Sequence, residues 1–267
     1  MQAKKRKIIM TSRKFEVNLC PHGYNTNSDL CVRDSLLPHN RAALCAPIRV
    51  LIALSHFNLL PSPARLMITS AKQYSPACER NQSFILPHLQ SHLSTAKHVL
   101  EIGSGTGQHA IFFSQNLPHL IWQTSDRAEN HPSIHAWIDE HHNPQVRRPI
   151  ELDVGQSEWP SILIDAAFTA NTCHIMHIDE VAMMFAGVSR LLSDGGLMVI
   201  YGPFNYAGQF TSASNQEFDM ALKLQAAHRG IRHIEDIQSM AIQHRLTLTH
   251  DHAMPANNRL LVFRKST

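Results

Sequence analysis

The sequence of 267 residues predicts an α/β fold, a single domain built on a mostly parallel sheet and preceded by a leader of different character. Three observations lead to this prediction. From Met67 onward, apolar strand-like runs alternate with helical segments, and a glycine-rich turn follows the first of these runs. Two strand-like runs with no helix between them close the chain. Residues 1–66 show neither the two-residue periodicity of strands nor the 3.6-residue periodicity of helices.

The predicted elements follow one another in the order that a parallel sheet requires. The predicted strands are 96–102, 120–125, 148–154, 165–170 and 197–201, and the closing strands are 246–250 and 260–264. The predicted helices are 107–116, 132–141, 178–192, 214–228 and 235–244. Asp194–Gly196 is predicted as the turn that leads into 197–201. Parallel neighbours need helical crossovers, so helices should cover both faces, and the last two strands should form an antiparallel hairpin.

The leader differs in charge from the rest of the chain. Residues 1–66 hold ten Lys or Arg against three Asp or Glu, a net +7, whereas 67–267 carries a net −4. The cluster Lys4–Lys7 has the composition of a targeting tag or a nucleic-acid-binding arm. The lack of periodic patterning favours a disordered leader instead, or translation that begins at Met67. The expected domains are therefore 1–66, a leader or start-site artefact, and 67–267, the folded domain.

Composition excludes several classes of protein. The longest apolar run, residues 50–60, is shorter than the roughly 20 residues of a membrane span and contains His56 and Asn58. The five cysteines show no CxxC spacing, which indicates neither a disulfide framework nor a zinc site. The basic excess lies outside the folded domain, unlike the basic stripe of a nucleic-acid-binding surface. We therefore expect a cytoplasmic monomer or homodimer with no membrane or nucleic-acid partner.

The glycine turn Gly103–Gly107 follows a predicted strand and opens a predicted helix. Glycines permit positive φ and a close approach of the backbone to a ligand, and the helix start presents N–H donors. The spacing is GxGxG, with Glu101 before it, rather than the GxGxxG of dinucleotide enzymes. A carboxylate at that position suits a cation better than a pyrophosphate. The turn therefore indicates S-adenosylmethionine rather than NAD, and a tight turn without a ligand is the alternative.

Polar residues also end the next three predicted strands. Asp126 follows the second strand, where an acidic residue accepts from ribose hydroxyls, and Asp153 ends the third, where it would accept from the adenine amino group. Asn171 follows the fourth strand, at the lip beneath which the methyl group is expected. A helix cap at Asp126 and a strand-end turn at Asp153 are the alternatives. The predicted cofactor-binding residues are Glu101, Gly103, Ser104, Gly105, Gly107, Asp126, Asp153 and Asn171.

Methyl transfer depends mainly on positioning, and it needs a base only when the acceptor is protonated. His174 is the candidate base because its ordinary pKa lies near neutrality, and Tyr201, at the end of the fifth strand, is predicted beside the expected methyl position. No metal site is predicted, because the pair His174 and His177 lacks a third ligand. The predicted substrate-binding residues are Ser75, Glu79, Arg80, Asn81, Phe204, Asn215, Asn257 and Asn258.

Each of these acceptor-side residues has a structural alternative. Ser75 with Pro76 has the pattern of a helix N-cap followed by proline at the first helical position. Phe204 is equally compatible with core packing. Adjacent asparagines such as Asn257 and Asn258 are common turn formers before a strand.

Five segments together carry a resemblance to a known family. They are Tyr74–Asn81, Glu101–His109, Phe168–Asn171 with His174 and Ile175, Tyr201–Phe204, and Met254–Asn258. This combination resembles the poorly characterised class I methyltransferase-like family that includes vertebrate methyltransferase-like protein 26. The resemblance covers essentially residues 67–267. It implies a seven-stranded Rossmann-like methyltransferase fold and S-adenosylmethionine binding, and it implies no particular substrate.

Taken together, the residues and the resemblance predict an enzyme, an S-adenosylmethionine-dependent methyltransferase that acts on a small-molecule acceptor. The alternative is a non-catalytic cofactor-binding or scaffold protein on the same fold.

Overall fold

The computed structural model describes residues 9–10, 13–14 and 71–267. The chain divides into two compact units, Met1–Ser62 and Pro63–Thr267. In the first unit, β1 (Ile9–Met10) pairs with β2 (Arg13–Lys14) in antiparallel orientation. The other residues of the expected leader lie outside the described part of the chain. All that follows concerns the second unit.

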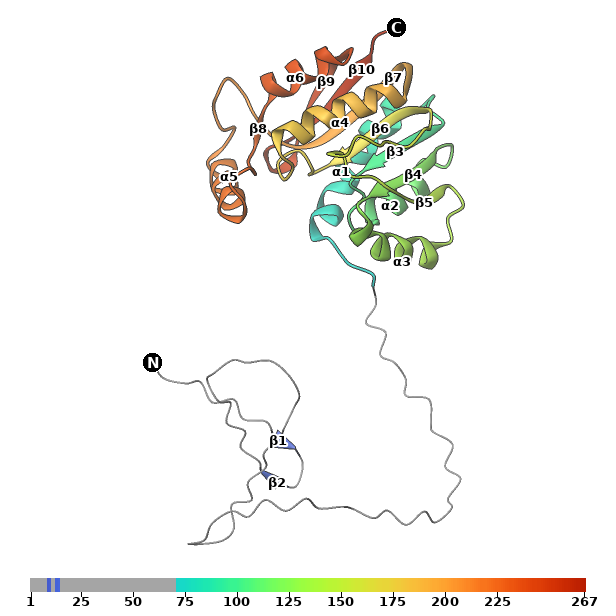
Figure 1. Ribbon diagram of the computed structural model, residues 1–267, viewed down its shortest axis with the longest axis vertical. Coiled ribbons are helices and arrows are strands. Elements are labelled where there is room, and N and C mark those ends of the chain that lie inside the picture. The colour runs from blue at the N-terminus through green and yellow to red at the C-terminus, as the bar shows by residue number, and fades with distance from the viewer. Residues whose placement is uncertain (1–8, 11–12, 15–70) are drawn as a thin grey trace. The chain divides into compact units, whose positions relative to one another are not determined.

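The second unit is built on one eight-stranded sheet (Figure 1). Its strands are β3 (His98–Ile102), β4 (Ile121–Asp126), β5 (Val146–Glu151), β6 (Ile164–Ala170), β7 (Leu192–Asn205), β8 (Arg232–His233), β9 (Leu246–Met254) and β10 (Asn258–Lys265). The order is β5-β4-β3-β6-β7-β10-β9, with β8 paired to β7. Strands β3 to β7 run parallel, and β10 is antiparallel to both β7 and β9. The predicted α/β fold and its terminal antiparallel hairpin are confirmed.

The strand count is eight rather than seven because β8 adds a short parallel pairing. Its two residues, Arg232 and His233, lie opposite Phe204 and Asn205 at the end of β7. The main path of the sheet contains the other seven strands.

Helices cover both faces of the sheet, as crossover connections between parallel strands require. The helices of the second unit are α1 (Pro76–His92), α2 (Gln108–Asn116), α3 (His131–His141), α4 (Ile178–Leu191), α5 (Ala213–Gln225) and α6 (Ile234–Gln243). Buried residues of α1, α2 and α3 share one apolar core with the sheet, and those of α4 and α6 share the other. Figure 1 shows α4 and α6 together on their face of the sheet. Among the described residues, none of the helices has the length and apolar character to cross a membrane.

Two elements differ from the prediction. Helix α1 precedes the first predicted strand, and its N-cap is Ser75, whose side chain accepts from the Cys78 N–H, with Pro76 at the first helical position. Strand β7 begins at Leu192, because Asp194–Gly196 lies within it as an irregularity rather than as a turn before it. The pairing of β6 with β7 shifts register across this stretch, which accommodates the extra residues.

The topology brings four strand ends to one crevice. Strands β3 and β6 are neighbours, but the chain leaves β3 toward β4 and β5 and leaves β6 toward β7. Ligands of open α/β sheets bind at the carboxyl ends of the strands beside such a reversal of strand order. The glycine turn follows β3, and Asp126, Asp153 and Asn171 lie at or just after the ends of β4, β5 and β6.

Candidate functional site

A cavity of about 580 Å³ lies at this crevice, within the range of small-molecule and cofactor sites. Seven of the predicted site residues line this cavity: Ser75, Gly103, Ser104, Gly105, Asp126, Asp153 and Asn171. A second cavity of about 640 Å³ lies between the loop 155–161 and α4. It contains none of these residues, so the cavity at the strand ends is the candidate site.

The glycine turn has the backbone conformation that its residues permit. Gly103 has a φ of +70°, and a Cβ there would lie 2.8 Å from Thr172 Cγ2, so a side chain would collide with the segment after β6. Gly105 has a φ of +56°, and a Cβ there would meet nothing within 4 Å. Gly105 lines the cavity, so its backbone faces open space without a side chain between it and a ligand.

Glu101 lies beneath the turn and is not one of the residues that line the cavity. Its side chain is buried, and Oε2 accepts a hydrogen bond of 3.1 Å from Trp122 Nε1. Burial raises the pKa of Glu101 to about 7, and the nearby Asp126 carboxylate also raises it. Glu101 is therefore a carboxyl group with a proton to lose near neutral pH, behind the backbone that lines the cavity.

Asp126 joins the end of β4 to the glycine turn. Its Oδ2 accepts from the Gly105 N–H at 2.7 Å, and its Oδ1 accepts from the Arg127 N–H and from Asn130 Nδ2, both at 2.8 Å. The carboxylate lines the cavity although only 7% of the residue is exposed. This network orients the carboxylate at the position where the sequence predicts ribose recognition.

Asp153 and Asn171 line the same cavity. Asp153 Oδ1 accepts from the Gly155 N–H at 3.0 Å, which is the strand-end turn that the sequence allows as an alternative. Asn171 has a φ of +61°, uncommon for a residue with a side chain, and its N–H donates to the Tyr201 carbonyl at 2.8 Å. Asparagine tolerates this left-handed conformation better than most residues with a side chain.

The start of α1 is fastened to the start of α2 beside the cavity. The Ser75 N–H donates to Gln108 Oε1, and His109 Nε2 lies 2.7 Å from Asn81 Oδ1 in the interior. Cys78 lines the cavity, and burial raises its pKa, so it remains a thiol. Burial lowers the pKa of His109 to about 4, so this imidazole, which also lines the cavity, is neutral.

The predicted residues of this segment therefore separate. Ser75 reaches the cavity, whereas Asn81 acts through His109. Glu79 and Arg80 are exposed on α1 and do not line the cavity. Gly107 is the N-cap of α2 and does not line it either.

The two predicted catalytic residues are buried beside the cavity rather than on its wall. His174 contacts Phe218, with ring centroids 5.4 Å apart, and burial, followed by the charges of Arg232 and Arg229, lowers its pKa to about 4. Tyr201 is 5% exposed and belongs to the apolar core on the α1 side of the sheet, and burial raises its pKa. Neither side chain lines the cavity.

The remaining predicted substrate residues have structural surroundings. Phe204 is 1% exposed and packs in the core on the α4 side, as its packing alternative requires. Asn215 Nδ2 donates to Thr211 Oγ1 at 2.8 Å and to the Asn257 carbonyl at 3.2 Å, which fastens α5 to the turn before β10. Asn258 Nδ2 donates to the Pro255 carbonyl within that turn. None of these side chains lines the cavity.

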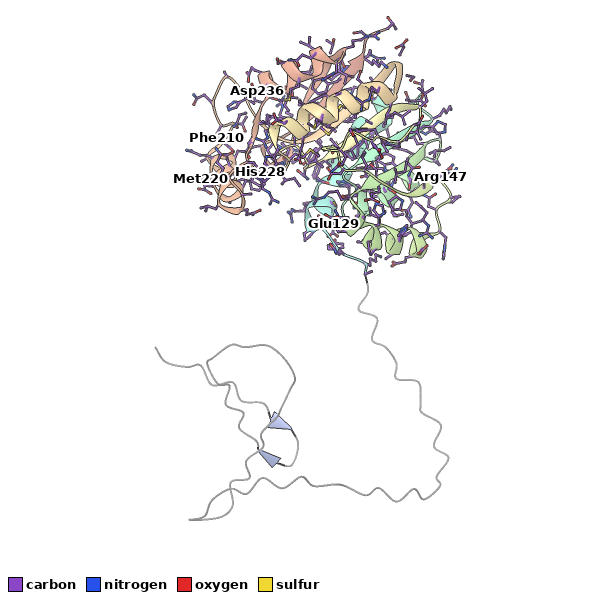
Figure 2. All side chains as sticks on the ribbon, in the orientation of Figure 1. Glu129, Arg147, Phe210, Met220, His228 and Asp236 are labelled. Carbon is purple, nitrogen blue, oxygen red and sulfur yellow. The ribbon has the colours of Figure 1, made fainter. Side chains whose placement is uncertain are left out.

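Polar residues that the prediction omits occupy other parts of the cavity wall. His177 and His228 stack with ring centroids 3.7 Å apart, and Figure 2 labels His228 on the segment between α5 and β8. Glu180 Oε2 accepts from the His177 N–H, and Arg229 lies next to His228. His177 is the N-cap of α4 and Glu180 is its third helical residue, but histidine is not one of the usual N-cap residues, so the sequence does not signal this pair. No local pattern signals His228 or Arg229, because a loop distant in sequence brings them to the wall.

Several solved structures that match this fold are described as methyltransferases. An O-methyltransferase family protein from Burkholderia thailandensis matches with a TM-score of 0.64 and 15% identity, over 72% of this chain and 58% of that chain. Human N-acetylserotonin methyltransferase in complex with SAM matches with a TM-score of 0.56 and 15% identity, over the same shares. An O-methyltransferase family 2 protein from Planctomyces limnophilus in complex with apigenin matches with a TM-score of 0.57 and 17% identity, over 64% and 50%. At these identities the likeness establishes the class I methyltransferase fold alone.

The chain spans only 50–58% of the length of these three proteins. A family model described as a protein of unknown function (DUF938) matches residues 72–265, which is nearly all of the second unit. The chain therefore belongs to the DUF938 family.

Proposed function

We propose that this protein is an S-adenosylmethionine-dependent methyltransferase that acts on a small organic molecule. The observation that carries the proposal is the convergence of the glycine turn, Asp126, Asp153 and Asn171 on one cavity at the carboxyl ends of four adjacent strands. We also propose that the protein belongs with the methyltransferase-like family that includes vertebrate methyltransferase-like protein 26, which its sequence motifs resemble.

The residues of the cavity fit the cofactor in charge and in shape. The backbone at Gly105 is open to a ligand, and a Cβ there would lie in empty space. Asp126 offers carboxylate oxygens to ribose hydroxyls, and Asp153 offers an acceptor to the adenine amino group. Glu101, beneath the turn, supplies negative charge toward the cationic methionine part when it is ionised. When bound, S-adenosylmethionine would supply a methyl group on a positively charged sulfur.

A small organic acceptor is supported by the solved structures of the same fold. Two of them are described as O-methyltransferase family proteins, and one of these holds apigenin. The proposal includes the predictions made from the sequence. These are a cytoplasmic location, a monomeric or dimeric state, and no nucleic-acid or membrane partner.

Proton removal from the acceptor is assigned to an imidazole near the cavity. His174 remains the predicted base, although its lowered pKa, which leaves it neutral, also makes it a weaker proton acceptor than an ordinary histidine. It lies behind the wall, whereas His177 and His228 are on it. Substitution of His174 by Gln should reduce turnover without weakening cofactor binding if it acts as the base. If the base is instead a histidine that lines the cavity, substitution of His228 by Gln should reduce turnover without weakening cofactor binding.

The burial of both His174 and Tyr201 also favours a second candidate function, a non-catalytic protein that binds the cofactor. Such a protein would retain the cavity and its strand-end carboxylates without a group positioned for the acceptor. The two functions differ in turnover and agree in cofactor binding.

The deciding experiment has two stages on the purified full chain. Calorimetric titration with S-adenosylmethionine tests binding, and the absence of both heat and a thermal shift would contradict both functions. Incubation with cofactor labelled in its methyl group and a metabolite extract then tests transfer. Labelled product that requires Asp126 supports the methyltransferase, and binding without labelled product across the extract supports the non-catalytic protein. Asp126→Ala serves as the inactive control, and Glu151→Gln, an exposed carboxylate at the end of β5, serves as the matched control.

A further inference from the structure

Four histidines face one another across the interface of α1 and β9. His88 and His92 are four residues apart on α1 and therefore share one face of the helix. His250 and His252 are two residues apart on β9 and share one face of the sheet. The ring centroids lie 4.3 Å apart for His88 and His252 and 4.6 Å apart for His92 and His250. None of the four lines the candidate cofactor cavity.

The closest pair has a spacing suited to metal chelation. His92 Nε2 lies 2.9 Å from His252 Nε2. Imidazole nitrogens bind transition metals at about 2.0–2.1 Å, so two nitrogens at this separation subtend an angle of about 90° at a shared ion. That angle is the one between neighbouring ligands in square-planar and octahedral complexes, which Cu²⁺ and Ni²⁺ adopt with nitrogen ligands. A tetrahedral zinc site would place the nitrogens roughly 3.3 Å apart.

Imidazole binds a metal through an unprotonated ring nitrogen, and histidine has one near neutral pH. The nearby carboxylate, Asp251, is engaged by Arg259 at 2.7 Å.

The number of ligands is limited by the present side-chain positions. In the part of the chain that the structure describes, no three or more His, Cys, Asp or Glu side chains are grouped to hold one metal ion. The geometry is therefore that of a two-nitrogen chelate, with water filling the remaining positions. His250 is exposed and His88, His92 and His252 are half-buried, so the pair is within reach of solvent.

We propose that His92 and His252 chelate one Cu²⁺ or Ni²⁺ ion between α1 and β9. This site is separate from the cofactor cavity and does not depend on the proposed function. The rings of His88 and His250 lie beside the chelating pair, where a change of side-chain rotamer would add further nitrogen ligands. A bound ion would fasten α1 to the edge strand β9 and so stabilise the domain.

The test is a titration of the untagged full chain with Cu²⁺ in the presence of glycine as a weak competitor. We expect one equivalent to bind, a rise in Tm, and an electron paramagnetic resonance spectrum with two imidazole nitrogens on the copper. His92→Ala with His252→Ala should weaken binding at least tenfold. His98→Ala with His135→Ala removes two histidines outside the cluster, and this matched control should change the affinity less than twofold.

Three results would overturn the proposal. They are the absence of one-equivalent binding, unchanged affinity in the His92/His252 variant, and equal loss of affinity in the control variant. If the His92/His252 variant fails to fold, the spectrum of the wild-type protein decides, because fewer than two coordinated imidazoles excludes the chelate. In that case the 2.9 Å contact is a hydrogen bond between two imidazoles.

Discussion

The Asp126 carboxylate accepts a hydrogen bond of 2.7 Å from the backbone N–H of Gly105, across the gap between the ends of two parallel strands. The same carboxylate accepts from the Arg127 N–H and from Asn130, so one side chain organises three segments around the cavity. The open middle of the glycine turn is thus held in place by the residue predicted to bind the ribose.

Asp126→Asn is expected to weaken S-adenosylmethionine binding by roughly 10- to 100-fold, because a hydrogen bond to a charged group contributes about 1.5–3 kcal/mol. The amide keeps one acceptor oxygen but loses the charge and one of the two acceptors. Titration calorimetry measures the affinity. Glu151→Gln, which removes an exposed carboxylate on the neighbouring strand end, should bind like the wild type. Wild-type affinity in Asp126→Asn would show that this carboxylate does not contact the cofactor.

Gly105→Ala and Gly195→Ala form a matched pair. Both glycines have positive φ, +56° and +75°, and a Cβ at either position meets nothing within 4 Å. Each substitution should therefore cost about 1 kcal/mol of stability through backbone strain. Only Gly105 lines the cavity, so only Gly105→Ala should also weaken cofactor binding. Chemical denaturation and calorimetry separate the two effects, and equal affinities in both variants would contradict a ligand-facing turn.

Glu101 should make the stability of the protein depend on pH. The pKa of Glu101 is raised from 4.5 to about 7 in the folded state. Between pH 4.5 and pH 7, the folded protein therefore still holds a proton on Glu101 that the unfolded chain has already lost. The stability that this proton provides is complete below about pH 4.5 and is lost as the pH rises through 7.

Glu101→Gln removes this titration while keeping an acceptor for Trp122 Nε1. Relative to the wild type, the variant should gain stability as the pH rises from 4.5 to 8, by up to about 3 kcal/mol. Urea denaturation across this range, without cofactor, measures the difference. Glu129→Gln is the control, because Glu129 is exposed (Figure 2) and forms only a surface ion pair with Arg127. A constant difference between Glu101→Gln and the wild type at every pH would refute a raised pKa.

Asn215→Ala is expected to destabilise the domain without changing cofactor affinity. Its side-chain amide donates to Thr211 and to the Asn257 carbonyl, and the two lost hydrogen bonds should cost about 1–3 kcal/mol. A decrease in Tm of roughly 2–10 °C follows for a domain of this size. Calorimetry on the folded variant at low temperature then measures the affinity for S-adenosylmethionine. A variant of unchanged Tm that no longer binds would instead assign Asn215 to the site.

The parts of the site that sequence reasoning found lie at strand ends. Gly105, Asp126, Asp153 and Asn171 lie at or just after the ends of β3, β4, β5 and β6, and the ends of parallel strands meet at one edge whatever the details of packing. Helix α1 was signalled only by its cap, Ser75 and the proline after it, because its apolar positions form no strong stripe.

The sequence predicts the positions of Tyr201 and Phe204 wrongly, because both lie on a strand that is longer than the sequence predicts. Tyr201 ends the predicted strand 197–201, Phe204 follows it, and the sequence predicts both on the acceptor side. Strand β7 in fact continues to Asn205, and both side chains enter the apolar cores. How far a strand continues depends on its partners, here β8 and β10, which come from the last third of the chain.

The sequence by itself determined the order of strands and helices, the terminal hairpin and the residues at the carboxyl ends of the strands, because these follow from local periodicity and from turn residues. Only the tertiary structure decided which side chains face the cavity, which enter the core, and that His92 meets His252. Those two histidines are 160 positions apart, and their contact depends on the packing of α1 against the edge strand β9. No local pattern encodes a distance between elements so far apart in the chain.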